Sequence, residues 1–180
     1  LYDSTPNNNN ATNVTDVTAT SSGKVGAAAN FSGSNYLTVP SILSLVSTSQ
    51  FTVSAFVYPQ TLTSRAWFSK ATAGVYTDDI LFGIDEVPFY QVNNGANSSA
   101  ITPATIYVNN WYGLAVAFDG SQAGSENRLK IYQNAVQQTA DFISESYVVP
   151  ATTSSNTGLE YIGTHGGTAS SWRWLSNIDE

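Results

Sequence analysis

A stretch of alternating residues near the middle of the chain gives the clearest structural signal. Residues 111–118 carry aromatic or aliphatic side chains at every even position. The odd positions carry Trp111, Gly113, Ala115 and Ala117. Because successive side chains of a strand point to opposite faces, this pattern predicts a strand with both faces covered, as in a packed sandwich. A polar turn at Asp119-Gly120 separates it from a second predicted strand, 128–134.

Short predicted strands separated by turn residues recur along most of the chain. Residues 51–57 alternate apolar and polar side chains, which predicts a strand with one buried face. The other predicted strands are 25–31, 36–39, 66–70, 79–84, 88–92, 104–108, 147–149 and 159–163. The first 22 residues are dominated by Asn, Thr and Ser, which favours a surface loop or a peripheral strand. We therefore expect one all-β domain, a sandwich or barrel, over residues 1–180.

Charge and cysteine content narrow the classes of function. Asp, Glu, Lys and Arg make up 11% of the residues, against about a quarter in average soluble proteins, and the formal net charge is −7. Six Lys and Arg residues cannot neutralise a row of phosphates, which argues against nucleic acid and anionic membrane surfaces as partners. No apolar run is long enough to span a bilayer, so we expect no membrane insertion. Without cysteine, packing alone must hold the domain.

Several motifs occur in the order that a known family shows. They are Asn30 to Leu37, Phe51 to Phe56, Trp111 to Gly120, Leu129 to Ala135, Ile162-Gly163, and Ile178-Asp179-Glu180 at the end. This series resembles the laminin-G-like or pentraxin-like branch of the concanavalin A-like lectin/glucanase domains over almost the whole chain. The resemblance implies an antiparallel β-sandwich jelly roll.

Two places depart from the family pattern. The family's Asn-Gly turn is Asn134-Ala135 here, so the glycine that favours positive φ is missing, and we expect a looser hairpin or another turn type. In the family, Ile-Asp-Glu begins a long closing strand, whereas this sequence stops at Glu180. The final family strand is therefore expected to be missing, which suggests a fragment of a larger protein or a strand donated by a neighbouring chain.

The carboxylates do not follow the pattern of a hydrolase. Jelly rolls of this family include β-glucan hydrolases, whose catalytic carboxylates alternate on one strand as Glu-x-Asp-x-Glu or Glu-x-Asp-x-x-Glu. No Glu in this chain is followed two places later by Asp. We therefore expect no enzymatic activity and keep a glycoside hydrolase relative without that motif as a minor alternative. Asp119 is expected to cap the turn before Ser121.

Asp78 and Asp79 are the candidate metal ligands. They precede an apolar run, and the segment resembles the pentraxin segment in which an Asp-Asn pair binds calcium, with Asp78 the closer match. Calcium takes several oxygen ligands, and adjacent carboxylates repel each other unless they are solvated or bridged by a cation. The further acidic ligands of pentraxins should follow Ile162-Gly163, but residues 164–168 contain no acid. Solvated turn carboxylates are the alternative to a calcium site.

The segment from His165 to Trp174 is the candidate ligand-binding site. His165 lies in a glycine-rich loop, where an exposed histidine without function is the alternative to glycan contact or metal ligation. Trp172, Arg173 and Trp174 follow, and the two tryptophans would lie on the same face of a strand. Together with the loop they would form a platform for a sugar ring, unless the indoles pack into the core.

Two functions compatible with these features remain open. The first is a non-enzymatic recognition or adhesion domain of a secreted, cell-surface or virion protein, which binds glycan or another surface polymer. The second is a structural module that decorates or assembles into a virion, filament or surface layer through contacts with copies of itself. The hydroxyl-rich, charge-poor composition and the expected missing strand fit the second function. In either case we expect the protein outside the cell or on a virion surface.

Overall fold

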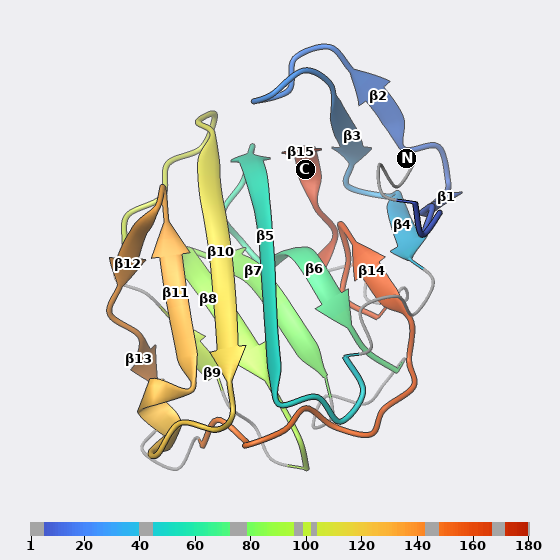
Figure 1. Ribbon diagram of the computed structural model, residues 1–180. Coiled ribbons are helices and arrows are strands. Elements are labelled where there is room, and N and C mark those ends of the chain that lie inside the picture. Colours follow the sequence, from blue (N-terminus) through green and yellow to red (C-terminus); the bar gives the residue numbers. More distant parts are fainter. Residues whose placement is uncertain are drawn as a thin grey trace.

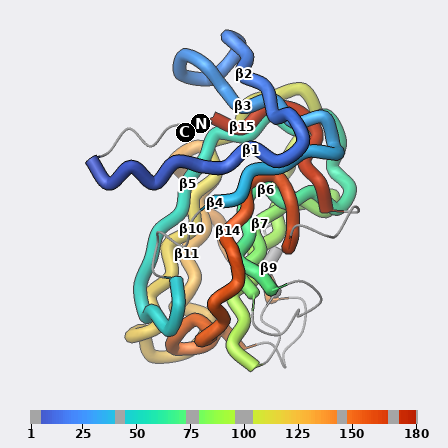
Figure 2. Tube along the Cα trace, turned by 90° about the vertical axis from the view of Figure 1, so that its right-hand side faces the viewer, coloured from blue at the N-terminus to red at the C-terminus, as the bar shows by residue number. Residues whose placement is uncertain are grey.

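Two antiparallel sheets lie face to face in the computed structural model of the protein, which describes residues 6–39, 45–72, 79–95, 99–101, 104–142, 148–166 and 172–179. Figure 1 shows one sheet in front of the other, and the view turned by 90° in Figure 2 separates β5, β10 and β11 from β6, β7 and β9. This architecture confirms the antiparallel β-sandwich jelly roll that the family resemblance implies. Helical conformation in the described residues is limited to the short 3-10 helix η1 (Ser125–Asn127) and to Trp172.

The described strands form one sheet of eight and one of seven. In spatial order the eight-stranded sheet contains β1 (Thr12–Val14), β4 (Tyr36–Val39), β14 (Glu160–Ile162), β6 (Arg65–Lys70), β7 (Ile80–Asp85), β8 (Val87–Val92), β9 (Ser99–Ile101) and β13 (Asp141–Phe142). The seven-stranded sheet contains β12 (Val136–Gln138), β11 (Leu129–Gln133), β10 (Tyr112–Asp119), β5 (Gln50–Pro59), β15 (Leu175–Asp179), β3 (Ala28–Ser32) and β2 (Thr18–Thr20).

The core fills the space between the two sheets. It is built from alternate residues of the long strands, among them Val57, Phe82, Tyr90, Leu114 and Val116, each of them at most 1% exposed. Burying such side chains stabilises the fold by roughly 1.5 to 3 kcal/mol each. The alternating pattern of the sequence therefore places one face of each sheet inside and leaves the opposite face as an outer surface.

Three predicted segments turn out differently or more definitely than the sequence alone suggested. The polar first 22 residues provide β1 and β2, at the edges of the two sheets, which confirms a peripheral location. The strand predicted at 104–108 is wrong, because only Ile106 enters the core and the Tyr107 amide donates to the Tyr112 hydroxyl (2.8 Å) instead of to a neighbouring strand. Val148 and Val149 are also irregular, whereas Tyr147 lies outside the described residues.

The Ile178-Asp179 motif lies inside the seven-stranded sheet. Its strand, β15, pairs with β3 on one side and with β5 on the other, where it covers residues 56–59. These pairs join the N-terminal strands to the rest of the sheet. Donation of a further strand by a neighbouring chain stays a prediction.

Candidate functional site

The outer face of the seven-stranded sheet is open where the sequence predicted a covered surface. Along β10 the even-numbered side chains are buried, whereas Gly113, Ala115, Ala117 and Asp119 are only half-buried. The expectation that both faces of this strand are covered is therefore wrong. The cause is the small size of the first three of these outward residues, which leaves room above them.

Gly113, Ala115 and Ala117 form a floor on the outer face, and side chains of the two neighbouring strands project on both sides of it. On β5, Thr52, Ser54 and Phe56 lie opposite Ala117, Ala115 and Gly113, respectively. On β11, Lys130 and Tyr132 lie opposite Ala117 and Ala115. A Cβ atom at Gly113 would come within 3.1 Å of the Phe56 ring, so a larger residue would narrow the floor.

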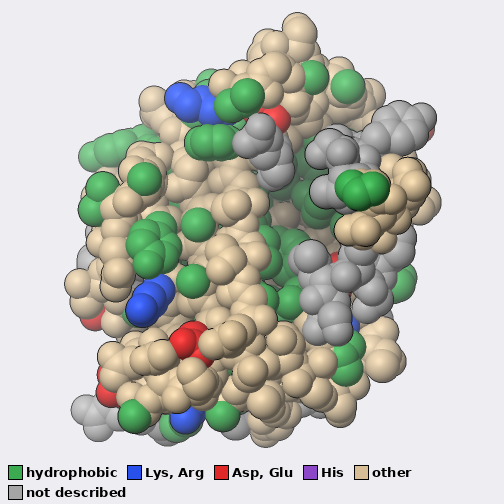
Figure 3. All heavy atoms as spheres, viewed as in Figure 1, with side chains coloured by type: hydrophobic (Ala, Val, Ile, Leu, Met, Phe, Trp, Pro, Cys, Tyr) green, Lys and Arg blue, Asp and Glu red, His purple; other side chains and the backbone are tan. Residues whose placement is uncertain are grey.

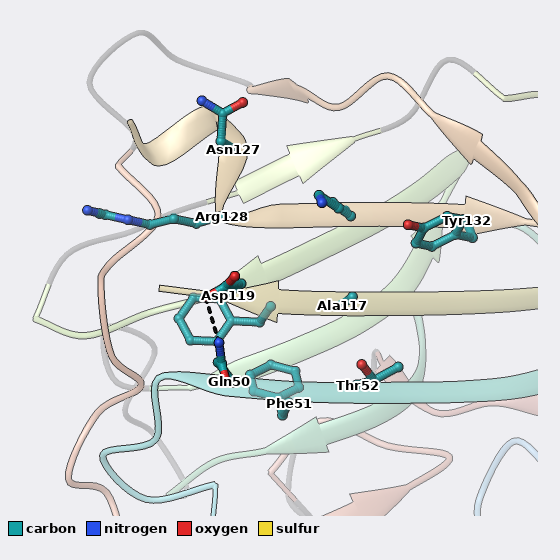
Figure 4. A pocket seen from close by; sticks show the side chains of 10 residues that line it. Gln50, Phe51, Thr52, Ala117, Asp119, Asn127, Arg128 and Tyr132 are labelled. Carbon is teal, nitrogen blue, oxygen red and sulfur yellow. Dashed lines mark hydrogen bonds between the residues drawn. The ribbon is translucent and has the colours of Figure 1, made fainter. Parts of the chain in front are cut away.

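Two hollows lie end to end on this face and share Thr52 and Tyr132. The first has a volume of about 550 Å³ and is lined by Thr52, Ser54, Ala55, Phe56, Gly113, Leu114, Ala115, Tyr132, Asn134 and Ala135. The second has a volume of about 480 Å³ and is lined by Gln50, Phe51, Thr52, Ala117, Phe118, Asp119, Asn127, Arg128, Lys130 and Tyr132. We call the two hollows together the groove. Figure 4 shows the second hollow, with Ala117 on the floor between Thr52 and Tyr132.

Asp119 is the carboxylate in the lining of the groove. Its Oδ1 accepts hydrogen bonds from the Ser121 hydroxyl (2.6 Å), the Ser121 amide (3.1 Å) and Gln50 Nε2 (3.0 Å), the last drawn in Figure 4. Its Oδ2 accepts one from Gln122 Nε2 (2.6 Å). The side-chain hydrogen bonds from Ser121, Gln50 and Gln122 hold the pKa of Asp119 well below its ordinary value. The predicted cap of the turn before Ser121 is confirmed.

The hairpin between β11 and β12 borders the first hollow, which has no charged residue in its lining and is the apolar end of the groove. Asn134 and Ala135 both have positive φ, 52° and 66°, which is the conformation of a two-residue type I′ turn. The expectation of a looser hairpin or another turn type is therefore wrong. Asn134 accounts for the difference, because its side-chain Oδ1 accepts a hydrogen bond from the Gly113 backbone amide (2.9 Å). The backbone amide of Asn134 in turn donates to the Gly113 carbonyl (2.7 Å). The turn keeps its geometry although Ala135 lacks the freedom of glycine.

His165 and Asp79 come together on the outer side of the eight-stranded sheet. His165 Nε2 lies 2.7 Å from Asp79 Oδ2, and Gln91 Nε2 and Asn93 Nδ2 each donate to Oδ1 at 2.8 Å. His165 is 4% exposed and Asp79 is 1% exposed, so the alternative of an exposed loop histidine is wrong. The burial fits the pairing, since an unpaired carboxylate is costly inside a protein.

The metal candidates do not show an oxygen cage in the described part of the chain. Asp78 lies outside the described residues. Both oxygens of Asp79 are already engaged in hydrogen bonds, and no described group of three His, Asp or Glu side chains is placed to hold a metal ion. Calcium prefers six to eight oxygen ligands, which these residues do not supply. Calcium binding at Asp78 and Asp79 stays a prediction.

The two tryptophans of the predicted platform are separated from each other. Trp174 is fully buried in the core (0% exposed). Trp172 is half-buried, with its ring centroid 5.9 Å from that of Phe89 and 6.4 Å from that of His165. The half-buried Arg173 lies over the Tyr36 ring, with 4.7 Å from Cζ to the centroid. The expectation that the indoles share one face is wrong because the chain is irregular at 172–174 and β15 begins only at Leu175.

The residues around the groove were overlooked in the sequence, although a signal for them exists. Phe56 follows Thr52 and Ser54 on the same face of β5, and Tyr132 follows Lys130 on β11, so aromatic rings occupy an otherwise polar face. An aromatic residue on a polar face, beside a strand whose outward side chains are small, indicates a ring that a ligand can reach.

Comparison with known sequences and structures identifies the family. Residues 31–180 match the sequence model of the Concanavalin A-like lectin/glucanases superfamily. The chain belongs to this superfamily. A comparison with curated proteins finds no match. No helix in the described part of the protein is both long enough and apolar enough to cross a membrane.

Three solved structures illustrate the likeness of this chain to known folds. The chain is similar to domain 4 of AbnA, an extracellular GH43 arabinanase from Geobacillus stearothermophilus, solved with arabinotriose (20% identity, TM-score 0.66, 92% of this chain and 73% of that one). It is similar to the CBM40 of the Ruminococcus gnavus IT-sialidase bound to α2,3 sialyllactose (13%, 0.57, 94% and 87%). It is also similar to domains LG4-5 of the mouse laminin α1 chain (12%, 0.57, 92% and 40%). These likenesses show the superfamily fold.

Proposed function

We propose that this domain is a non-catalytic carbohydrate-binding module that holds a glycan chain in the groove of the seven-stranded sheet. The observation that carries the proposal is the half-buried Tyr132 ring beside a floor of small residues, with Phe56 on the opposite side. Sugar rings present apolar C–H faces and polar edges, and a site with aromatic walls and a few fixed polar groups suits both.

The polar end of the groove supplies the fixed hydrogen-bonding groups. Asp119, Gln50 and Lys130 line it, and Asp119 is held by its bonds to Ser121 and Gln122. Hydroxyl groups of a sugar donate to such a carboxylate and accept from amide and ammonium groups. The charged residues of the groove, Asp119, Arg128 and Lys130, line this end, whereas no charged residue lines the other hollow.

The same carboxylate argues against glycoside hydrolysis. A glycosidase needs a general acid whose pKa is raised, together with a second carboxylate across the scissile bond. The pKa of Asp119 is lowered instead, chiefly by the hydroxyl of Ser121, so this group stays ionised at neutral pH. It can accept hydrogen bonds from a ligand but has no proton to donate.

The similar structures support a glycan ligand without defining it. Two of them contain an oligosaccharide, and the arabinanase is extracellular. We therefore propose that the module acts outside the cell and that its ligand is a polysaccharide of a cell wall or surface layer.

The test is binding of the purified protein to a panel of soluble and insoluble polysaccharides, with and without a calcium chelator. Tyr132→Ala should weaken binding at least about tenfold, because it removes one aromatic wall. Tyr36→Ala is the matched control, since Tyr36 is a half-buried tyrosine on the other sheet. Equal losses in the two variants would contradict the groove as the site. Chelator-sensitive binding would support the calcium prediction, whereas assembly without any glycan signal would favour the structural module.

A further inference from the structure

The outer face of the seven-stranded sheet continues beyond the groove as a row of residues that crosses four strands. Asn30 of β3 lies opposite Asn177 of β15, and Asn177 lies opposite Tyr58 of β5. The Tyr58 ring in turn contacts Trp111, which precedes β10, with 5.4 Å between the ring centroids. At a strand spacing of about 4.8 Å, the row spans roughly 14 Å from β3 to β10.

The two asparagines form a hydrogen-bonded amide pair with unused polar atoms. Asn30 Nδ2 donates to Asn177 Oδ1 at 2.6 Å. This single bond leaves Asn30 Oδ1 as an acceptor and Asn177 Nδ2 as a donor, and neither atom makes another hydrogen bond to the chain within the described structure. Both residues are half-buried, so their orientation is restricted while their edges remain accessible. Such a pair complements two neighbouring hydroxyl groups, one donating and one accepting.

The aromatic end of the row adjoins the groove. Tyr58 and Trp111 are both half-buried, and their rings are tilted by 55°. Phe56, which lines the groove, lies two residues before Tyr58 and on the same face of β5. The row and the groove are therefore parts of one outer face, on which Figure 3 shows scattered hydrophobic side chains and separate charged side chains among uncharged side chains and backbone.

Charge on this part of the face is low. Asp179, opposite Phe56, is the acidic residue nearest to the row on β15, and its Oδ2 accepts the Val25 amide at 2.7 Å. At 4% exposure it contributes little to the surface. An uncharged ligand with hydroxyl groups fits these surroundings better than an ionic one.

We propose that Asn30, Asn177, Tyr58 and Trp111 form a second subsite, which binds a sugar residue of the same glycan through a pair of adjacent hydroxyl groups. The amide pair binds the hydroxyls, and the Tyr58 and Trp111 rings contact the apolar face of the sugar. The inference rests on the proposed function of the groove. It specifies the ligand as a chain of several residues that lies along β5 and β10 in the groove and continues across β5 and β15 in the row, and not as a single sugar or a chain end.

The test compares short and long ligands of one kind by isothermal titration calorimetry. Arabinotriose and arabinohexaose, and cellotriose and cellohexaose, serve as probes. We expect the hexaose of the preferred series to bind more tightly than the triose. Asn177→Ala should lower hexaose affinity about tenfold through the loss of one or two hydrogen bonds and leave triose affinity unchanged. Trp111→Ala should likewise lower hexaose affinity and leave triose affinity unchanged. With two variants, the test still works if one of them fails to fold.

Controls separate the failure of this subsite from the failure of the proposed function. Asn94→Ala removes an exposed asparagine that donates to the Thr152 carbonyl, away from the row, and it should change neither affinity. If wild-type protein binds a hexaose through Tyr132 but both subsite variants bind it unchanged, the second subsite is overturned and the groove stands. An equal loss for triose and hexaose overturns it as well. If wild-type protein binds no oligosaccharide or polysaccharide, both proposals fail.

Discussion

Replacing Gly120 by alanine should strongly destabilise the protein, although the change adds only one methyl group at the start of a turn. Gly120 follows the groove carboxylate, Asp119, and its amide donates to the Ser49 carbonyl at 2.8 Å. A Cβ atom at Gly120 would stand 1.7 Å from the carbonyl oxygen of Ala151 and 2.4 Å from its carbonyl carbon. The backbone of one segment therefore occupies the space that any side chain at position 120 would need.

The size of the effect follows from what would have to move. Relief of the overlap requires a shift of more than about 1 Å in one of the two backbones. The segment around Ala151 is held by hydrogen bonds from the Thr153 amide to the Thr48 carbonyl (2.9 Å) and from the Thr153 hydroxyl to the Leu45 carbonyl (2.8 Å). Overpacking costs roughly 1 to 3 kcal/mol and a strained or lost hydrogen bond about 1 kcal/mol more. We expect a loss of about 3 kcal/mol in the free energy of unfolding.

Urea denaturation followed by tryptophan fluorescence measures this loss, and thermal melting should show a fall of roughly 6 to 12 °C for a chain of this size. Gly95→Ala is the control, because Gly95 has a φ of 75° and no atom of the described residues, its two chain neighbours aside, would lie within 4 Å of a Cβ atom at that position. It should cost only about 1 kcal/mol, through backbone strain alone. If Gly120→Ala proves no more destabilising than Gly95→Ala, the close approach to Ala151 does not constrain the fold.

Three further predictions concern the hairpin, the buried network and the groove carboxylate. Ala135→Gly should raise the free energy of unfolding by about 0.5 to 1 kcal/mol in urea titrations, because the relief of positive-φ strain outweighs the entropy that glycine gains when unfolded. His165→Ala should lower it by about 2 to 4 kcal/mol, since buried Asp79 loses a hydrogen-bond partner, and a cycle with Asp79→Asn should show coupling of at least about 1 kcal/mol. Asp119 should remain ionised below its ordinary pKa of 3.8 in NMR titrations, and Ser121→Ala should raise its pKa.

For each of these three predictions, one experimental result would contradict the physical reason given for it. A loss of stability in Ala135→Gly would mean that the turn is not type I′ in solution. Additive effects of the two substitutions at positions 79 and 165 would show that the pair does not interact. For Asp119 the folded pKa is lowered, so its hydrogen bonds favour folding at neutral pH, and this contribution is lost as pH falls from the ordinary value through the lowered one. Titration at the ordinary value would exclude these bonds.

Much of the fold could be predicted because its main determinants are local in the sequence. The buried face of β10 alternates strictly, and the Asp119-Gly120 turn combines a side-chain cap with a residue that must lack Cβ. Alternation of this kind predicts a strand, and an Asp-Gly pair after it predicts a turn, without knowledge of the rest of the fold. The type I′ turn at Ala135 escaped prediction because the stabilising contact, from Asn134 to Gly113, joins residues 21 positions apart.

The candidate site was harder to predict because it depends on which strands are neighbours. Trp111 and Tyr58 become one aromatic pair only when β5 and β10 are aligned, and Asn30 meets Asn177 only through the pairing of β3 with β15. A sequence without these registers shows isolated aromatic and amide residues. His165 likewise looks like a loop residue until Asp79 is placed beside it.

The two outer faces differ because the chain covers one of them. Residues 164–166 and Trp172 lie on the outer side of the eight-stranded sheet, where the Ser69 hydroxyl donates to the Thr164 carbonyl (2.8 Å) and Trp172 packs on Phe89. The buried pair of His165 and Asp79 attaches the same segment to the start of β7. Polar and aromatic residues that looked suited to ligand binding are therefore used to close this face. The outer face of the seven-stranded sheet stays open instead, because its small residues leave the groove between Phe56 and Tyr132.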